Sequence, residues 1–225
     1  MMKKTLLAVA LALVATNANA IVVSGNLALT GENTVNILSP NSWGPISSIP
    51  DGGYTRGLSG TLISNVTGTF TATYLGQVAS FANYFLAGGN ELNGGRPARG
   101  QTVAGIGNTI STGVTAGNAV DFAFGRDNNG DGVPDLPNVV NGDPNQARRG
   151  ILYFLNTFNL TDAGGQAFDF LIGFNDAAPD NDYDDYVVGV TAAPAAVPLP
   201  AALPLLVSAF GVFGLARRKN KAKAV

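Results

Sequence analysis

The feature that most constrains this chain is an apolar run close to its C-terminus. Residues 199–216 are 18 in number and carry no charge. A helix of that length rises about 27 Å, close to the roughly 30 Å of a bilayer's hydrocarbon core. Basic residues follow at once in 217–223, which the positive-inside rule places on the cytoplasmic side. The pattern predicts a transmembrane helix over 199–216, because the alternative, a buried helix, is rarely apolar on every face.

The N-terminus has the features of a secretory signal peptide. Lys3 and Lys4 precede an apolar run over residues 6–15, and the segment ends Ala18-Asn19-Ala20. These three features predict a signal over residues 1–20 that is cleaved between Ala20 and Ile21. An uncleaved membrane anchor is the alternative, although it needs a longer apolar run than this one.

The residues at the two ends of the C-terminal apolar run are as informative as the run itself. A proline-containing motif opens it and a basic cluster closes it: Val197, Pro198, Leu199, Pro200 and Ala201, then Arg217, Arg218 and Lys219. The order of motif, helix and basic end resembles the PEP-CTERM sorting signals of Gram-negative bacteria, in the variant with a Val-Pro-Leu-Pro-Ala motif. The resemblance implies a sorting signal over residues 197–223.

That resemblance also implies a partner and a location. Its members are recognised by an exosortase, a membrane-embedded cysteine peptidase that removes the helix. The expected precursor lies in the inner membrane, with its N-terminal part outside and its C-terminus cytoplasmic. The processed protein is then expected at the cell surface or outside the cell.

The charge of the part between the two terminal signals excludes one class of partner. Residues 21–196 carry six basic and 15 acidic side chains, a formal charge of −9, whereas the whole chain has −2. Binding to nucleic acid needs basic patches, so we expect none. An acidic body suits a divalent cation or a solvated surface.

Two residue types are missing from the chain. It has no Cys and no His. No disulfide can therefore support the exported fold, and most zinc sites and every Ser-His-Asp or Cys-His arrangement are excluded. The two glutamates, Glu32 and Glu91, lie in no recognisable motif for glycoside hydrolysis, which uses a pair of carboxyl groups. We expect a protein that is not an enzyme.

The body between the two signals has the pattern of β-structure. Short segments rich in branched or alternating apolar residues are separated by glycine pairs such as Gly88-Gly89 and Gly164-Gly165. The segments are 21–30, 67–75, 120–124, 151–158, 167–174 and 186–191. This predicts a mainly β fold, an antiparallel β-sandwich or jelly-roll ectodomain over residues 21–191. Residues 192–196 (AAPAA) are expected to be a linker to the membrane.

Residues 67–85 add a second resemblance to proteins that carry this sorting tail. Their bodies often have a strand that ends Tyr-Leu-Gly, then an Ala and an Asn-x-Phe. The matching residues here are Tyr74-Leu75-Gly76, Ala79 and Asn83-Tyr84-Phe85. The usual Glu between the Gly and the Ala is replaced by Gln77-Val78. The resemblance implies a common β-sandwich ectodomain and attaches no function to it.

The first concentration of acidic residues has the spacing of a calcium loop. Oxygen-bearing side chains stand at positions 1, 3, 5 and 9, a glycine stands at position 6, and a residue at position 7 can offer its carbonyl. The candidate ligands are Asp127, Asn129, Asp131, Val133, Asp135 and Asn138. The spacing resembles the loops of thrombospondin type 3 and dockerin repeats, except that Asn138 replaces the acid at position 12. It predicts a structural Ca²⁺ site; an ordinary Asp/Asn/Gly turn is the alternative.

The second concentration lies over residues 174–188, between two expected strands. Its candidate ligands are Asp176, Asp180, Asp182 and Asp185. The segment resembles the closing hairpin found before such sorting tails. A second, weaker Ca²⁺ site and a solvated acidic loop that keeps an edge strand from pairing are equally compatible with the pattern.

These observations lead to one expected function and one alternative. We expect an exported, non-catalytic protein of the cell surface or extracellular matrix, stabilised by Ca²⁺. The alternative is a carbohydrate-binding module that holds exopolysaccharide. Exposed Tyr54, Tyr84 and Tyr153 on one face would favour the alternative, whereas their burial would favour a structural role.

Overall fold

The computed structural model describes residues 21–36, 54, 56–79, 81–92, 105–127, 135–143, 150–176 and 182–196. The predicted signal peptide, sorting motif and transmembrane segment lie outside these ranges. Within them, no helix is long and apolar enough to span a membrane. Contacts divide the chain into two units, Met1–Pro194 and Ala195–Val225, and of the second unit only Ala195 and Ala196 are described.

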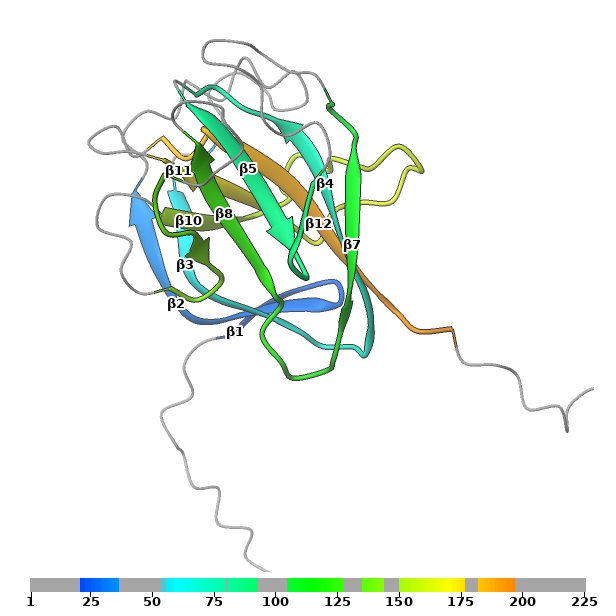
Figure 1. The fold of residues 1–225 in the computed structure, drawn as a ribbon. Coiled ribbons are helices and arrows are strands. Elements are labelled where there is room, and N and C mark those ends of the chain that lie inside the picture. The colour runs from blue at the N-terminus through cyan, green and yellow to red at the C-terminus, as the bar shows by residue number, and fades with distance from the viewer. Residues whose placement is uncertain are drawn as a thin grey trace, which may run out of the picture. The chain divides into compact units, whose positions relative to one another are not determined.

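The described residues form two antiparallel sheets (Figure 1). The larger has eight strands in the order β1 (Ile21–Ser24), β2 (Leu27–Asn36), β3 (Arg56–Ser64), β10 (Gly150–Leu155), β11 (Phe170–Asn175), β12 (Tyr186–Pro194), β4 (Gly68–Gly76) and β7 (Thr109–Val114). The smaller has four in the order β6 (Asn90–Glu91), β5 (Ala82–Ala87), β8 (Phe122–Asp127) and β9 (Val139–Val140). The prediction of a mainly β fold is confirmed.

The two sheets pack face to face through aromatic rings. In Figure 1, β5 and β8 lie in front of strands of the larger sheet. Phe124 of β8 stacks on Phe174 of β11, with 5.1 Å between the ring centroids. Phe122 of β8 lies 6.1 Å from Phe70 of β4. These rings are at most 2% exposed, so the space between the sheets is an apolar core, as in a β-sandwich.

The central strands of the larger sheet are buried on both faces. Leu152, Phe154 and Leu171 belong to a second apolar cluster, separate from the one between the sheets, and they are at most 1% exposed. Half-buried Tyr54 packs against this cluster, with its ring centroid 4.9 Å from that of Phe154. The alternation expected over 167–174 therefore gives way to continuous burial, because side chains from the connecting segments cover the outer face.

The first predicted strand is a hairpin in the structure. Residues 21–30 divide into β1 and the start of β2, with Ile21 opposite Thr30 and Ser24 opposite Leu27. Gly25 adopts φ = 58° in the turn, a conformation that glycine reaches without steric cost. Gly25-Asn26 is a recognised signal for a two-residue hairpin turn, and the prediction of one strand over 21–30 rested on branched residues and did not use this signal.

The last strand is longer than the sequence predicted. β12 continues through Pro194, with Ala192 opposite Phe70 and Pro194 opposite Gly68. The prediction of a linker over residues 192–196 is therefore wrong for its first three residues, because β4 extends far enough to pair with them. Only Ala195 and Ala196 of that segment lie beyond the sheet.

Candidate metal centre

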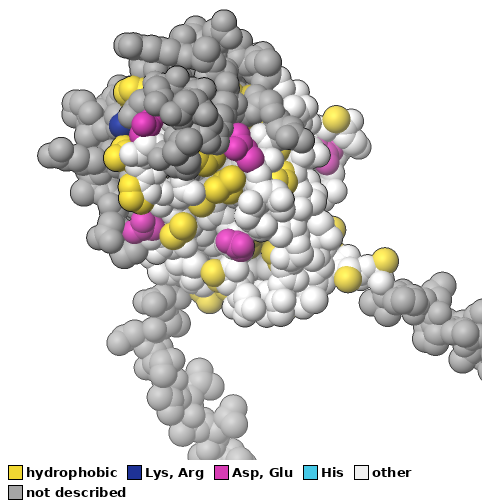
Figure 2. Space-filling model, in the orientation of Figure 1, with side chains coloured by type: hydrophobic (Ala, Val, Ile, Leu, Met, Phe, Trp, Pro, Cys, Tyr) yellow, Lys and Arg dark blue, Asp and Glu magenta, His cyan; other side chains and the backbone are white. Residues whose placement is uncertain are grey.

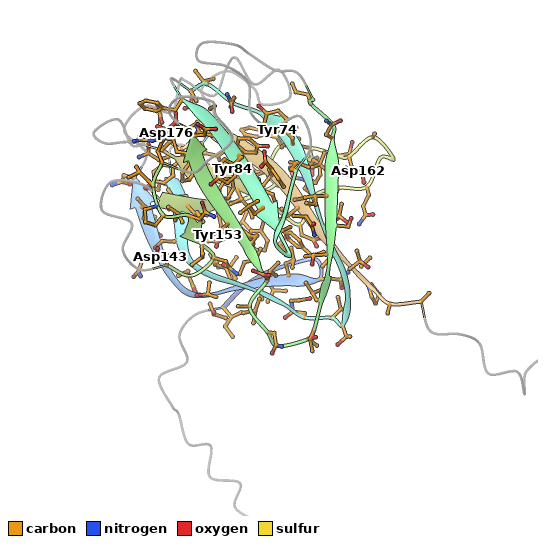
Figure 3. The ribbon with its side chains drawn as sticks, viewed as in Figure 1. Tyr74, Tyr84, Asp143, Tyr153, Asp162 and Asp176 are labelled. Carbon is orange, nitrogen blue, oxygen red and sulfur yellow. The ribbon has the colours of Figure 1, made fainter. Side chains whose placement is uncertain are left out.

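Strand alternation carries polar residues into one end of the space between the sheets. In β5, Phe85 points into the core, and Asn83 lies two residues before it on the same side. In β11, Phe174 points into the core, and Asp176 is two residues further on. Both polar side chains are buried, at 0% and 2% exposed. Figure 3 shows Asp176 at the end of the sheets where β8 finishes.

Hydrogen bonds join these residues across the two sheets. Asn83 Nδ2 donates to Asp176 Oδ2 at 2.6 Å and to the main-chain oxygen of Asp185 at 3.0 Å. The N–H of Asp176 donates to Asp185 Oδ2 at 2.7 Å. Arg126 Nη1 donates to the main-chain oxygen of Asp176 at 2.9 Å. The Asn83 amide of the smaller sheet is thus bonded to the residue that follows β11 and to the residue that precedes β12.

Three more oxygen donors lie beside this network. The carboxylates of Asp182, Asp184 and Asp185 each offer an oxygen, and these oxygens lie within 4.8 Å of one another. Asp184 is 0% and Asp185 is 6% exposed. Tyr183, which lies between Asp182 and Asp184 in the sequence, has φ = 58°, a left-handed conformation that is uncommon for a non-glycine residue. Such conformations often mark functional sites.

The electrostatics of this end disfavour an ionised Asp185. Burial, and after it the nearby carboxylate of Asp176, raises the pKa of Asp185 to about 9. The N–H of Asp176 acts in the opposite direction, while the carboxylates of Asp182 and Asp184 raise the pKa further. Burial and the neighbouring carboxylates thus act together against the ionised form of Asp185.

Two buried amides at this end have polar atoms without a hydrogen-bond partner among the described residues. The Oδ1 atom of Asn83 accepts no hydrogen bond there, although the Nδ2 of the same amide donates two. Gln77 is 1% exposed, and neither its Oε1 nor its Nε2 has a partner. It directly precedes Val78, whose N–H donates to the main-chain oxygen of Asp184 at 2.8 Å. An unpaired buried amide costs free energy unless a ligand satisfies it.

The first acidic segment lies on another face. Asp127 ends β8 opposite Ala82, whereas its neighbour Arg126 is opposite Asn83. Because successive strand residues alternate, Asp127 lies on the face of the smaller sheet away from Asn83. Asp127 is 0% exposed.

The rest of that segment is described only in part. The N–H of Asp135 donates to the main-chain oxygen of Arg126 at 3.1 Å. Asn138 Oδ1 accepts a hydrogen bond from the Tyr84 hydroxyl at 2.7 Å. Asn129, Asp131 and Val133 lie outside the described residues. The side-chain oxygen of Asn138, a predicted calcium ligand, therefore already accepts a hydrogen bond from within the chain.

The second acidic segment is the one in which described carboxylates come together. Asp176, Asp182 and Asp185 were predicted, and Asp180 lies outside the described residues. Asp184, Asn83 and Gln77 were missed as site residues. A signal for Asn83 was present, because it stands at an inward position of an otherwise apolar strand, two residues before Phe85.

The tyrosines that could have formed a sugar platform are mostly internal. Tyr84 and Tyr153 are at most 1% exposed. The Tyr153 hydroxyl donates to Asn141 Oδ1 at 2.7 Å, and Asn141 also binds the main chain of Leu62 in β3. Tyr54 is half-buried, and its hydroxyl donates to the main-chain oxygen of Leu155 at 2.7 Å. Tyr84 and Tyr153 therefore serve packing.

Among the described residues on the face drawn in Figure 2, acidic side chains lie at separate places between neutral and apolar atoms. The acidic character of the body is instead partly internal, in the buried aspartates that follow β11 and precede β12. This placement favours an enclosed cation over a broad ion-binding surface.

The chain matches no protein-family model, no curated protein and no solved structure. The cluster offers only oxygen donors, and carboxylate and amide oxygens suit hard cations such as Ca²⁺ and Mg²⁺. It could hold a metal ion.

Proposed function

We propose that this chain is an exported, non-catalytic structural protein of the cell surface or extracellular matrix. The observation that carries the proposal is the internal use of its aromatic and acidic side chains. Tyr84 and Tyr153 pack inside the fold, and Asp176, Asp184 and Asp185 are buried together. Aromatic and acidic side chains that are buried in this way stabilise the fold and cannot contact a substrate at the surface.

The proposed route to the surface rests on the two terminal sequences. A signal peptide over 1–20 directs export, and a PEP-CTERM-like signal over 197–223 retains the precursor in the inner membrane through a helix over 199–216. An exosortase then releases an antiparallel β-sandwich or jelly-roll ectodomain. The strand that ends at Pro194 supports this order, because the sheet is complete before the motif begins at Val197.

Intact mass and cell fractionation test the route. The protein recovered from the envelope or medium is expected to begin at Ile21 and to lack the basic end. In a strain without the exosortase, it is expected to stay in the inner membrane. A released form that still carries Arg217 and Lys219 would contradict the proposal.

A carbohydrate-binding module is the second candidate, and one groove favours it. The groove has a volume of about 400 Å³, within the range of small-molecule sites. Its lining is rich in hydroxyl, amide and carboxylate groups that can bond sugar hydroxyls: Thr30, Asn33, Ser59, Thr61, Asp143 and Tyr183. Co-sedimentation with exopolysaccharide from the producing cells tests it. Binding that is lost in Asn33→Ala and kept in the exposed-turn variant Asp162→Asn would favour this second function.

The proposal includes Ca²⁺ as a structural cofactor. The sequence pattern predicted it first at Asp127–Asn138, a segment of which the candidate residues Asp127, Asp135 and Asn138 are described. A cation that binds the folded protein and not the unfolded chain adds about 2.7 kcal/mol at a hundred times its dissociation constant. Melting of the full-length protein in Ca²⁺ and in chelator tests the cofactor.

A further inference from the structure

We propose that the Ca²⁺ site lies between the two sheets, in a cluster formed by Asp176, Asp182, Asp184, Asp185 and Asn83. We call these five residues the inter-sheet cluster. The inference rests on the proposed role of Ca²⁺ as a stabiliser and names its site, which differs from the segment that the sequence favoured.

The first argument is enclosure. Asp176, Asp184 and Asp185 are at most 6% exposed, and the ligand atoms of Asp182, Asp184 and Asp185 lie within 4.8 Å of one another. Two oxygens on opposite sides of a Ca²⁺ ion are about 5 Å apart, since each bond is about 2.3–2.6 Å. The carboxylates therefore already have a separation that one ion can span.

The second argument is Asn83, which is independent of the acidic residues. Its side chain is 0% exposed and is held in the cluster by the bonds from Nδ2 to Asp176 and Asp185. Its Oδ1 has no partner in the described part of the chain. Because Nδ2 is already used as a donor, rotating the amide would not satisfy the oxygen without losing those bonds. A cation supplies what that oxygen lacks.

The third argument is the repulsion among the carboxylates. The ligand oxygens of Asp182, Asp184 and Asp185 lie within 4.8 Å of one another, and Asp184 and Asp185 are buried, so like charges face each other at close range. A dication placed among them reverses the sign of the interaction with each carboxylate.

The position of the inter-sheet cluster explains what the ion would do. Asn83 belongs to β5 of the smaller sheet, whereas Asp176 follows β11 and Asp185 precedes β12 of the larger sheet. A bound Ca²⁺ thus joins the two sheets at one end of their shared core. Its removal loosens this end and leaves the aromatic core intact.

The test is Ca²⁺ binding to the full-length protein in mild detergent, measured by titration calorimetry and by thermal melting in Ca²⁺ and in chelator. Asp184→Asn keeps the size of the side chain and removes one charge, and it is expected to weaken Ca²⁺ binding about tenfold or more. In chelator it is expected to melt at or above the temperature of the wild type, which shows that it folds. Asn83→Ala, which changes no charge, is expected to weaken binding as well.

Two control variants locate the site. Asp127→Asn changes the other buried acidic segment, and Asp162→Asn changes an exposed turn on the opposite side of the sheets from Asp176 (Figure 3). Asp162 Oδ1 accepts from the N–H groups of Gly164 and Gln166, which an asparagine oxygen can also do. Both variants are expected to bind Ca²⁺ as the wild type does.

The outcomes separate this inference from the proposed function. A wild type that does not respond to Ca²⁺ overturns both the cofactor and its site. A response that is lost in Asp127→Asn and kept in Asp184→Asn overturns the inter-sheet cluster alone and returns the ion to the first segment. Export and surface sorting are measured separately by mass and fractionation, so none of these results decides them.

Discussion

Half-buried Asp169 and buried Asp185 lie at the opposite ends of the β11–β12 pair, and their surroundings differ. Asp169, just before β11, accepts the N–H of Ala192 at 3.0 Å and that of Asn26 at 3.4 Å. Asp185, just before β12, accepts one N–H and faces the carboxylates of Asp176, Asp182 and Asp184. Burial raises the pKa of both, but hydrogen bonds lower it at Asp169 while neighbouring charges raise it further at Asp185.

The difference separates two uses of a buried acid. At Asp169 the charge is matched by main-chain donors that bring the β1–β2 turn to the end of β12, which is what a structural carboxylate requires. At Asp185 three neighbouring side chains are also acidic, and their charges act against its ionised form. The first carboxylate is bound by main-chain donors, whereas the second lies in an acidic cluster that a cation would stabilise.

The largest predicted effect comes from breaking the Asp169 end. In Gly25→Ala, the added Cβ would overlap Asp169 Oδ1, and Gly25 also has φ = 58°. Lost hydrogen bonds to a charged group and left-handed strain together cost about 3 kcal/mol. Chemical denaturation measures the loss, which is expected to be the same with and without Ca²⁺.

Gly31→Ala is the matched control for that variant. Gly31 has φ = 66° and no atom within 4 Å of an added Cβ. Only the backbone strain remains, so the free energy of unfolding is expected to fall by about 1 kcal/mol. Equal losses in the two variants would show that the Asp169 contacts contribute little.

Asp185→Asn is expected to change sign with calcium. In chelator it removes the cost of burying an ionisable carboxyl group among other carboxylates and keeps an acceptor for the N–H of Asp176, so stability is expected to rise by about 1 kcal/mol. In saturating Ca²⁺ it removes a ligand, and stability is expected to fall by about 2 kcal/mol relative to the wild type. Denaturation curves in the two buffers measure both values. The same sign in both buffers would refute a cation at this end.

Tyr84→Phe tests whether the Asp127–Asn138 segment is anchored by the protein itself. It removes the hydroxyl that donates to Asn138 Oδ1 and is expected to cost about 1 kcal/mol. The cost, measured by denaturation, is expected to be independent of Ca²⁺. Tyr54→Phe removes a more exposed bond to Leu155 and is expected to cost less. A cost in Tyr84→Phe that appears only with Ca²⁺ would place an ion beside Asn138.

The smallest effect is the pH dependence due to Asp169. Burial raises its folded pKa above the ordinary value, so the folded state binds the proton more tightly than the unfolded chain does. Stability is therefore expected to fall as pH rises from the ordinary value to the raised one. Melting of the wild type and Asp169→Asn in chelator, from about pH 3 to about pH 7, measures the difference. A stability difference that is constant across this range would refute the assignment.

Local pattern was enough to predict some strands and not the site. The alternation in TGTFTATYL predicted β4, and the branched run after Asp185 predicted β12. The same pattern could place Asp176, Asp182 and Asp185 close together, because they are neighbours in sequence. It could not supply Asn83, which is 93 residues from Asp176 and reaches it only through the packing of one sheet on the other.

The place of β12 in the larger sheet has a mechanical consequence. This last strand lies between β11 and β4, with five residue pairs on one side and eight on the other. A pull on its C-terminal end loads both rows of hydrogen bonds in shear, since antiparallel bonds run perpendicular to the strands. β1, in contrast, pairs only with β2 and can be peeled away one bond at a time. Force that enters from the C-terminal side is therefore shared across the sheet.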